Sequence, residues 1–124
     1  MLHPIELKES EFNIQSKKLI NNERSLKKYN LLFVYANWCG HCTRFKKVYK
    51  ECAKIVGNVF NFYQIDTDKC KDLTNSLKVK GYPSVYLMDA SGRVYKEFNA
   101  DRSSSETFLA ELCSLTMGCP KIKK

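Results

Sequence analysis

The hydrophobic residues of this chain form short continuous runs and helical stripes, separated by polar stretches. The run LLFVYA is apolar at successive positions and rich in aromatic residues, which predicts a buried strand at the centre of a sheet. Gly92 lies in DASG between two further apolar segments, which predicts a hairpin turn. The predicted strands cover residues 11–15, 31–36, 59–65, 84–88 and 93–98.

Helical periodicity predicts four helices, covering about residues 17–28, 39–56, 69–77 and 104–116. The first has a sparse apolar face of Leu19, Ile20 and Leu26. In the second, apolar residues recur at steps of four, three and four: Phe45, Tyr49, Cys52 and Val56. The last has a similar stripe: Phe108, Leu109, Leu112 and Leu115. Ser16 is the predicted cap of the first helix, and Asp66 or Asp68 that of the third.

These elements follow one another in the order β-α-β-α-β-α-β-β-α, which places the chain in the α/β class. A length of 124 residues suits one compact domain with one hydrophobic core. We therefore expect a single domain over residues 1–124. Its core is expected at about 12–116, between a short N-terminal lead and a Lys-rich C-terminal tail.

The net charge of +8 comes mainly from lysines that are interleaved with acidic residues along the chain. This pattern is typical of a solvated surface rather than of a nucleic-acid site. No run approaches the roughly 20 apolar residues of a membrane span, and the first dozen residues lack the apolar stretch of an export signal. We expect no specific nucleic-acid partner, no membrane association and, by default, an intracellular (cytoplasmic) location.

The candidate chemistry lies in YANWCGHCTRF, where Cys39 and Cys42 open the second predicted helix. Unpaired N–H groups and the helix dipole at this position favour negative charge, so the pKa of Cys39 is expected to be lowered. Cys39 is then the attacking nucleophile, and Cys42, one turn later, the resolving thiol. Gly40 keeps the approach open, and a protonated His41 favours the thiolate over the disulfide.

Metal and haem sites fit the spacing less well than a redox dithiol. Haem attachment needs His directly after the second cysteine, where Thr43 stands. A zinc site needs a second close pair, and Cys113 and Cys119 are too far apart for the usual ligand spacing. We therefore expect no metal and no bound cofactor.

The string WCGHC, followed some forty residues later by KGYPSVYLM, resembles the thioredoxin superfamily. The active-site string is most similar to the catalytic domains of protein disulfide isomerase, whereas DTDKCKDL resembles a loop of animal cytosolic thioredoxins. The resemblance implies a thioredoxin fold, with a central mixed β-sheet flanked by helices. It also implies that Pro83 is cis and faces the two sulfurs, and that Trp38 and the backbone of Tyr82 hold an extended substrate.

The chain departs from these families at positions that matter for mechanism. Their buried acid on the central strand corresponds to Phe33, and a charged residue on the next strand corresponds to Gln64. Because that acid is thought to help the resolving cysteine lose its proton, we hypothesise that Cys42 attacks slowly. Lys47 and Asn37 replace two prolines of the relatives. By resemblance Arg102 is a possible modulator of the pKa of Cys42, or simply an exposed arginine.

The remaining cysteines of the chain allow both structural and reactive interpretations. Cys52 lies on the inward stripe of its helix, which favours a buried thiol. Cys70 matches a non-catalytic thiol of the cytosolic thioredoxin loop, so it is either structural or a modification site. Cys113 and Cys119 can close a disulfide in the tail or stay apart.

The leading hypothesis is a thiol–disulfide oxidoreductase that forms a mixed disulfide on Cys39, which Cys42 resolves. Its partners would be protein thiols and disulfides, with glutathione or a reductase or oxidase to recycle the dithiol. A second hypothesis is a docking module whose dithiol is regulatory. A third is a metal or cluster carrier. The sequence leaves open whether net reaction is oxidation, isomerisation or reduction.

Overall fold

The computed structural model describes residues 3–20 and 25–116 of the chain. The strands are β1 (Ile5–Glu6), β2 (Phe12–Asn13), β3 (Lys18–Leu19), β4 (Asn30–Tyr35), β5 (Asn61–Asp66), β6 (Ser84–Met88) and β7 (Val94–Glu97). The helices are α1 (Gly40–Val56), α2 (Lys71–Leu77) and α3 (Ser105–Cys113), with 3-10 turns η1 (Glu9–Glu11) and η2 (Ser114–Thr116). Among the described residues, no helix is both long enough and apolar enough to cross a bilayer.

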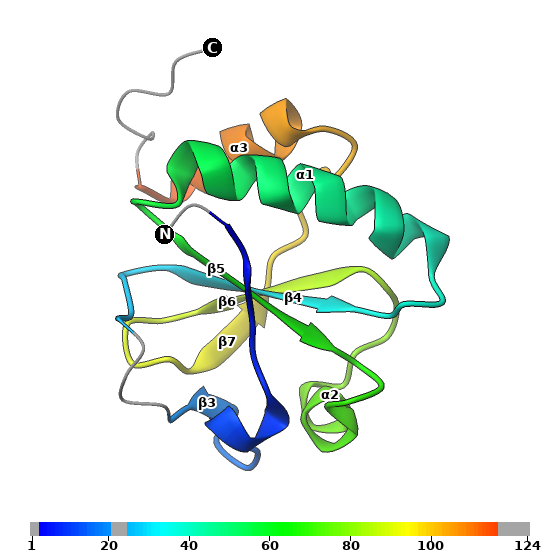
Figure 1. Cartoon of the computed structure of the whole chain (residues 1–124). Helices are drawn as coiled ribbons and strands as arrows, with labels where there is room; N and C mark the ends of the chain where they lie inside the picture. Colours follow the sequence, from blue (N-terminus) through cyan, green and yellow to red (C-terminus); the bar gives the residue numbers. More distant parts are fainter. Residues whose placement is uncertain (1–2, 21–24, 117–124) are drawn as a thin grey trace.

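A five-stranded sheet in the order β1-β5-β4-β6-β7 forms the centre of the fold. Strands β1, β5 and β4 run parallel, while β6 is antiparallel to β4 and β7 is antiparallel to β6. Helices α1 and α3 cover one face, and α2 and the β2–β3 hairpin lie at the other (Figure 1). The expected central mixed sheet flanked by helices is therefore confirmed.

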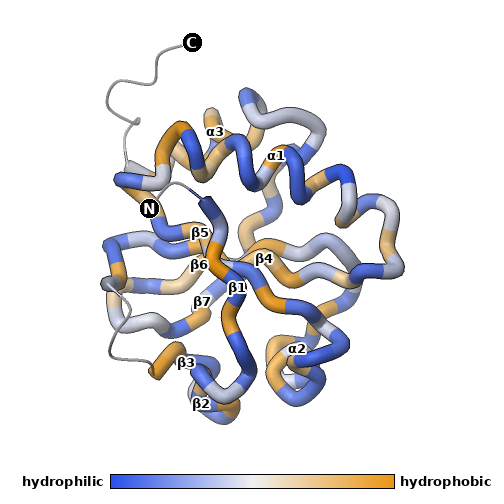
Figure 2. The backbone as a smooth tube through the Cα atoms, viewed as in Figure 1, coloured by the Kyte–Doolittle hydropathy of each residue, from blue (hydrophilic) through white to orange (hydrophobic). Residues whose placement is uncertain are grey.

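Strand β4 is buried at every position because both of its faces are covered. Leu31 and Phe33 pack into the layer with α1 and α3, whereas Leu32 and Val34 pack into the opposite layer. In Figure 2 the hydrophobic colouring gathers on the crossing strands, while α1 alternates between hydrophilic and hydrophobic residues. A continuous apolar run, rather than an alternating one, is what such a doubly covered strand requires.

Helix α1 has the predicted apolar stripe. Its buried residues are Cys42, Phe45, Tyr49, Cys52, Ala53 and Val56, which recur on one face. Lys47, Lys50 and Lys54 are exposed on the other side. The helix continues from Gly40 to Val56 without a break, so Lys47 extends a helix that a proline would interrupt. Cys39 is its N-cap, one residue before the first helical position.

The last helix also follows its predicted pattern, although it is shorter than predicted. The side chain of Ser104 caps α3 by accepting a hydrogen bond of 3.2 Å from the Thr107 N–H. Phe108 and Leu112 are fully buried against α1 and the sheet. The α-helix ends at Cys113, and the 3-10 turn η2 continues to Thr116.

The helix predicted over 17–28 is wrong in the part that the structure describes. Residues 18–19 form β3, which pairs antiparallel with β2, and Phe12 is aligned with Leu19. Leu19 is buried whereas Ile20 is 52% exposed. Successive residues of a strand point to opposite sides, so a strand buries Leu19 and leaves Ile20 in water. The sparse apolar face could not support a helix here.

The first strand of the central sheet is also not the predicted one. Residues 12–13 of the predicted strand belong to the separate hairpin, and β1 takes the place beside β5 with Ile5 aligned to Tyr63. Leu7, directly after β1, is buried. The sheet therefore includes part of the expected N-terminal lead, which lies before the expected core of 12–116.

Neither Asp66 nor Asp68 caps α2, contrary to the prediction. Cys70 is the N-cap without a side-chain cap bond. Instead, the Leu73 N–H donates a hydrogen bond of 2.8 Å to the Glu9 carboxylate of η1. A carboxylate from elsewhere in the fold thus satisfies a helix N–H that a local side chain usually satisfies.

Candidate active site

The two motif cysteines lie where β4 passes into α1. Between them and the strand, the chain makes a tight turn in which the Cys39 N–H donates to the Ala36 carbonyl at 3.1 Å. Asn37 in this turn donates from its amide to Asp66 at 3.0 Å, a bond that the proline of the relatives could not make. Cys39 is half-buried, whereas Cys42 is only 1% exposed. The structure therefore presents one sulfur and covers the other.

The protein environment separates the acidities of the two thiols. The pKa of Cys39 is lowered, first by the Cys42 backbone N–H, then by the Cys42 thiol, the His41 backbone N–H and the Arg44 charge, against an opposing effect of burial. Burial raises the pKa of Cys42 to about 11. The accessible thiol of Cys39 thus loses its proton more readily than that of Cys42, and the thiolate is the nucleophilic form.

His41 contributes through its backbone and through a contact with Arg44. Its Nδ1 atom lies at hydrogen-bond distance from the Arg44 guanidinium. Since a guanidinium can only donate, Nδ1 is the acceptor in this contact. Arg44 is a positive charge that lowers the pKa of Cys39. The expected effect of His41 on the thiolate stays a prediction.

Tyr82 faces Cys39 from the loop before β6, and its peptide bond to Pro83 is cis, as the resemblance implied. The expectation that Pro83 itself faces the sulfurs stays a prediction. The Cys39 thiol donates to the Tyr82 carbonyl at 3.7 Å. The Tyr82 hydroxyl is held at 2.7 Å from the Thr67 hydroxyl. Trp38 is 68% exposed and meets Tyr82 edge to face, with ring centroids 5.6 Å apart. The predicted residues Trp38, Cys39, Tyr82 and Pro83 therefore come together on one accessible surface.

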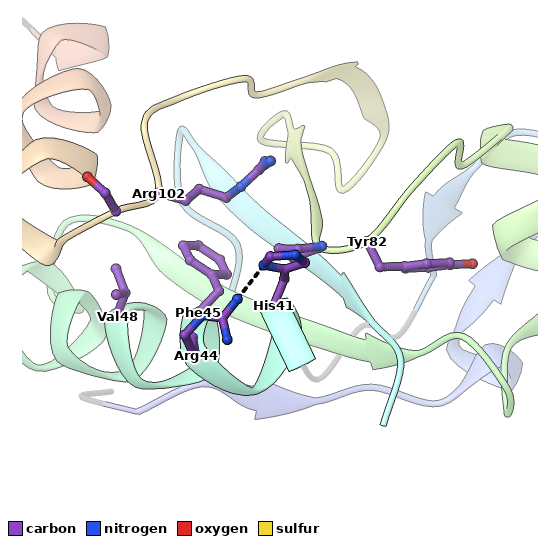
Figure 3. Close-up of a pocket in the computed structure, with 8 residues that line it drawn as sticks. His41, Arg44, Phe45, Val48, Tyr82 and Arg102 are labelled. Atoms are coloured by element: carbon purple, nitrogen blue, oxygen red, sulfur yellow. Dashed lines mark hydrogen bonds between the residues drawn. The ribbon is translucent and has the colours of Figure 1, made fainter. Parts of the chain in front are cut away.

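A pocket of about 430 Å³ adjoins this surface (Figure 3). Helix α1, the Pro83 loop and the loop after β7 line it with His41, Arg44, Phe45, Val48, Tyr82, Pro83, Arg102 and Ser103. Arg102 is half-buried here. The cation that lowers the pKa of Cys42 in the structure is Lys46, one helical turn further along α1. The role of Arg102 as a modulator of Cys42 stays a prediction.

The space beside Gly40, where a side chain would begin, is empty of other described residues. A Cβ atom added there would have no neighbour within 4 Å. The fold itself therefore does not require glycine at this position, and the role of Gly40 in keeping the approach open stays a prediction.

An aromatic cluster fills the position of the buried acid. Phe33 is fully buried and makes edge contacts with Phe45 and Tyr49, each with ring centroids 5.0 Å apart. Gln64 is aligned with Phe33 across β4 and β5, and its amide donates to Glu6 at 2.9 Å. An acid beneath the cysteines is thus replaced by apolar packing.

Three polar residues near this cluster were missed by the sequence analysis. The Tyr35 hydroxyl donates to Glu6 at 2.8 Å, and the Lys46 ammonium lies 3.9 Å from the centre of the Tyr35 ring. Lys46 is four residues after Cys42, a helical spacing that could have indicated its proximity. Glu6 had no such signal, because its place depends on the pairing of β1 with β5.

Cys52 and Cys70 are both buried thiols. Burial raises the pKa of Cys52 to about 12, and burial together with Glu9, Glu6 and Asp66 raises that of Cys70 to about 11. Both are 1% exposed or less, so the structural interpretation of Cys52 is supported and modification of Cys70 is disfavoured. Cys113 is buried, and the suggested partner Cys119 lies outside the described residues.

These buried thiols predict that the reduced protein loses stability in alkali. The pKa values of Cys42 and Cys70 are about 11 in the folded protein, against about 8.5 for an unfolded cysteine. Between about pH 9 and 11 the unfolded chain releases protons that the folded chain keeps, so the unfolding free energy falls as pH rises. Urea denaturation with reductant should show a loss of at least about 2 kcal/mol between pH 8 and 10.

The control for this measurement is Cys70→Ala, which removes one of the raised groups and should weaken the pH dependence. An unfolding free energy that stays constant over the same range would contradict the assignment of these thiols as buried and protonated.

No group of three or more His, Cys, Asp or Glu side chains in the described ranges is arranged to hold a metal ion. What the site does hold is a half-buried, acidified thiol beside a buried one, with an exposed surface around them. This arrangement is suited to thiol–disulfide exchange.

Comparison with known proteins agrees with this chemistry. The profile of the family described as Thioredoxin matches residues 4–112. A thioredoxin from Borreliella burgdorferi is 32% identical over 59 residues, which cover 48% of this chain and 50% of that protein. Protein disulfide-isomerase A6 from Mesocricetus auratus is 30% identical over 114 residues, which cover 90% of this chain but only 24% of that protein.

Solved structures show the same fold. The Trx4 domain of ERdj5 superposes with a TM-score of 0.70 at 22% identity, covering 94% of this chain and 97% of that one. Thioredoxin f from spinach chloroplast superposes with a TM-score of 0.62 at 20% identity, covering 79% of this chain and 81% of that one. The chain thus spans a quarter to a half of the length of the relatives it matches in sequence, and nearly all of a single solved domain.

Proposed function

Because the chain belongs to the thioredoxin family, with a domain similar to the catalytic domains of protein disulfide isomerases, we propose that it is a thiol–disulfide oxidoreductase acting on proteins. The observation that carries the proposal is the contrast between the two sulfurs. Cys39 is accessible and has a lowered pKa, while Cys42 is buried with a pKa of about 11. Nucleophilic attack and resolution are therefore divided between two residues one helical turn apart.

In the reducing direction, the Cys39 thiolate attacks one sulfur of a substrate disulfide, and the other sulfur leaves as a thiolate. Cys42 then loses its proton and attacks the Cys39 sulfur, which releases the second substrate thiolate. The protein ends as the Cys39–Cys42 disulfide, and the substrate has gained two electrons. Oxidation of a substrate dithiol is the reverse sequence.

Resolution by Cys42 is the slow step in this proposal. Its pKa of about 11 leaves little thiolate near neutral pH, and no carboxylate replaces the missing acid at Phe33. Lys46 is the cation that favours the Cys42 thiolate. Mixed disulfides with substrate are therefore expected to persist longer than if an acid assisted proton loss.

Substrate is proposed to lie across Trp38, Tyr82 and Pro83. Trp38 is largely exposed, and the Tyr82 carbonyl faces the reacting sulfur at 3.7 Å. Backbone groups in this position can form hydrogen bonds with the backbone of an extended substrate, whatever the substrate's sequence. A recycling partner, either glutathione or a separate reductase or oxidase, would restore the dithiol between turnovers.

Insulin reduction tests the proposal. With dithiothreitol as the reductant, a catalytic amount of the protein should precipitate insulin B chain much faster than dithiothreitol alone. A rate equal to that of dithiothreitol alone would overturn the enzyme assignment and favour the docking module with a regulatory dithiol.

Equilibration in graded glutathione buffers then gives the direction of net reaction, with Trp38 fluorescence as the readout. Stabilising the Cys39 thiolate stabilises the reduced form, which makes the disulfide more oxidising. We expect a midpoint above the thioredoxin value of about −270 mV, toward the isomerase value of about −180 mV. A midpoint at or below the thioredoxin value would instead favour a reductase.

A further inference from the structure

The pocket beside Cys39 lies where it can contact the side chain next to the reacting cysteine of a substrate. Tyr82 and Pro83 line the pocket, the Tyr82 carbonyl also faces Cys39, and His41 lies two residues after Cys39. Successive residues of an extended chain are about 3.3 Å apart. A substrate cysteine over Cys39 would therefore bring a neighbouring side chain to the mouth of this pocket.

Among the described residues, the pocket is lined by two arginines and by no acidic residue. Arg44 and Arg102 both line it, from α1 and from the loop after β7, and no Asp or Glu is among its lining residues (Figure 3). Neither arginine has an ion pair or hydrogen bond with a carboxylate in the part of the chain that the structure describes. Both positive charges are thus available to a ligand.

Two acidic residues close to Arg102 in the chain, Asp101 and Glu111, are engaged with the backbone. The Asp101 carboxylate accepts from the Ser103 N–H at 2.9 Å, and the Glu111 carboxylate accepts from the Asp101 N–H at 2.8 Å. These two bonds hold the carboxylates of Asp101 and Glu111 to backbone donors.

The floor of the pocket is apolar. Phe45 is buried and Val48 is half-buried, both on α1. A side chain with a short apolar stem and a negative end fits such a site, because the stem contacts the floor while the carboxylate meets the guanidinium groups. Arginine is well suited to this partner, since its planar N–H groups match the two oxygens of a carboxylate.

We propose that Arg44 and Arg102 select protein disulfides that carry Asp or Glu beside the reacting cysteine. The inference rests on the proposed oxidoreductase function and adds a substrate class to it. Arg44 also lowers the pKa of Cys39, so its loss changes the general rate of exchange. The selective effect is therefore measured as a ratio of rates within each variant.

The test uses two peptides, each with one internal disulfide, that differ only in Glu or Gln next to the cysteine to be attacked. Reduced protein is mixed with each peptide under single-turnover conditions, and release of peptide thiols is followed. Each turnover oxidises Cys39 and Cys42 to a disulfide and converts the peptide disulfide into two thiols. We expect the wild-type protein to reduce the Glu peptide about fivefold faster, the scale of exposed ion pairs.

In the double variant Arg44→Gln, Arg102→Gln, the Glu-to-Gln ratio should fall close to one. The matched control removes two exposed lysines outside the pocket, Lys54→Gln and Lys96→Gln, and should keep the wild-type ratio. An additional double variant, Arg44→Glu, Arg102→Glu, should prefer a peptide with Lys at the same position over the Gln peptide.

Equal rates for the two peptides in the wild-type protein would overturn the inference. A Glu-to-Gln rate ratio that stays at its wild-type value in the double arginine variant would also overturn the inference. If the lysine control lost the ratio to the same extent, the preference would come from the overall charge of +8 rather than from the two arginines. Failure to reduce either peptide would instead overturn the proposed function itself, so the two failures are distinguishable.

Discussion

Replacing Cys39 with serine should lower the rate of disulfide reduction by at least about a thousandfold, since a hydroxyl cannot act as the thiolate nucleophile. Among the free cysteines that the structure describes, Cys39 alone is both accessible and shifted to a lower pKa. The thiols of Cys42, Cys52 and Cys70 are buried, with pKa values of about 11 to 12. None of these three can take over the first attack.

The variant Cys42→Ser should behave differently. Its Cys39 can still attack a substrate disulfide, but the mixed disulfide has no resolving thiol and should accumulate. Mass spectrometry of the reaction, without added reductant, would show the protein with one substrate chain attached. Cys39→Ser should show no such species.

The control is Cys70→Ala, which removes a thiol buried on the opposite face of the sheet from Cys42 and should leave exchange unchanged. If Cys39→Ser kept most of the exchange rate, Cys39 would not be the nucleophile. The function would then have to be sought in docking rather than in catalysis.

The largest loss of stability is expected from Phe33→Asp. This change puts a carboxyl into the aromatic cluster, where Phe33 is fully buried against Phe45 and Tyr49. Removing a buried phenylalanine side chain costs about 3–5 kcal/mol, and an unpaired buried carboxyl adds to that cost. We expect a loss of at least about 4 kcal/mol, measured as the shift in the urea unfolding midpoint.

Phe33→Leu is the matched control, since it keeps an apolar side chain and should cost less than half as much. The loss for Phe33→Asp should be smaller near pH 4 than at pH 7, because burial raises the pKa of the new carboxyl and only its charged form is strongly disfavoured. An Asp variant as stable as the wild-type protein would show that the site already accommodates an acid.

Much of the fold was predictable because its signals are local. The run at 31–36 identified the central strand, and the stripe from Phe45 to Val56 identified α1 within one residue of its start. The β2–β3 hairpin was missed because it has no such local signal. Its stability comes from Leu19 packing with Phe12 and bonding to Gly92, contacts that leave no periodic pattern in the sequence.

The sequence by itself determined where the candidate dithiol lies and which of its sulfurs is acidified. Two cysteines at the junction of a buried strand and a helix meet helix N–H groups wherever the rest of the chain lies, so the acidification of Cys39 follows from local geometry. The tertiary structure decided the surroundings of that chemistry. It paired Glu6 with Tyr35, capped α2 with Glu9, and brought Arg102 into a pocket with Arg44. These contacts join residues far apart in the chain, so they depend on how the layers pack rather than on any local pattern.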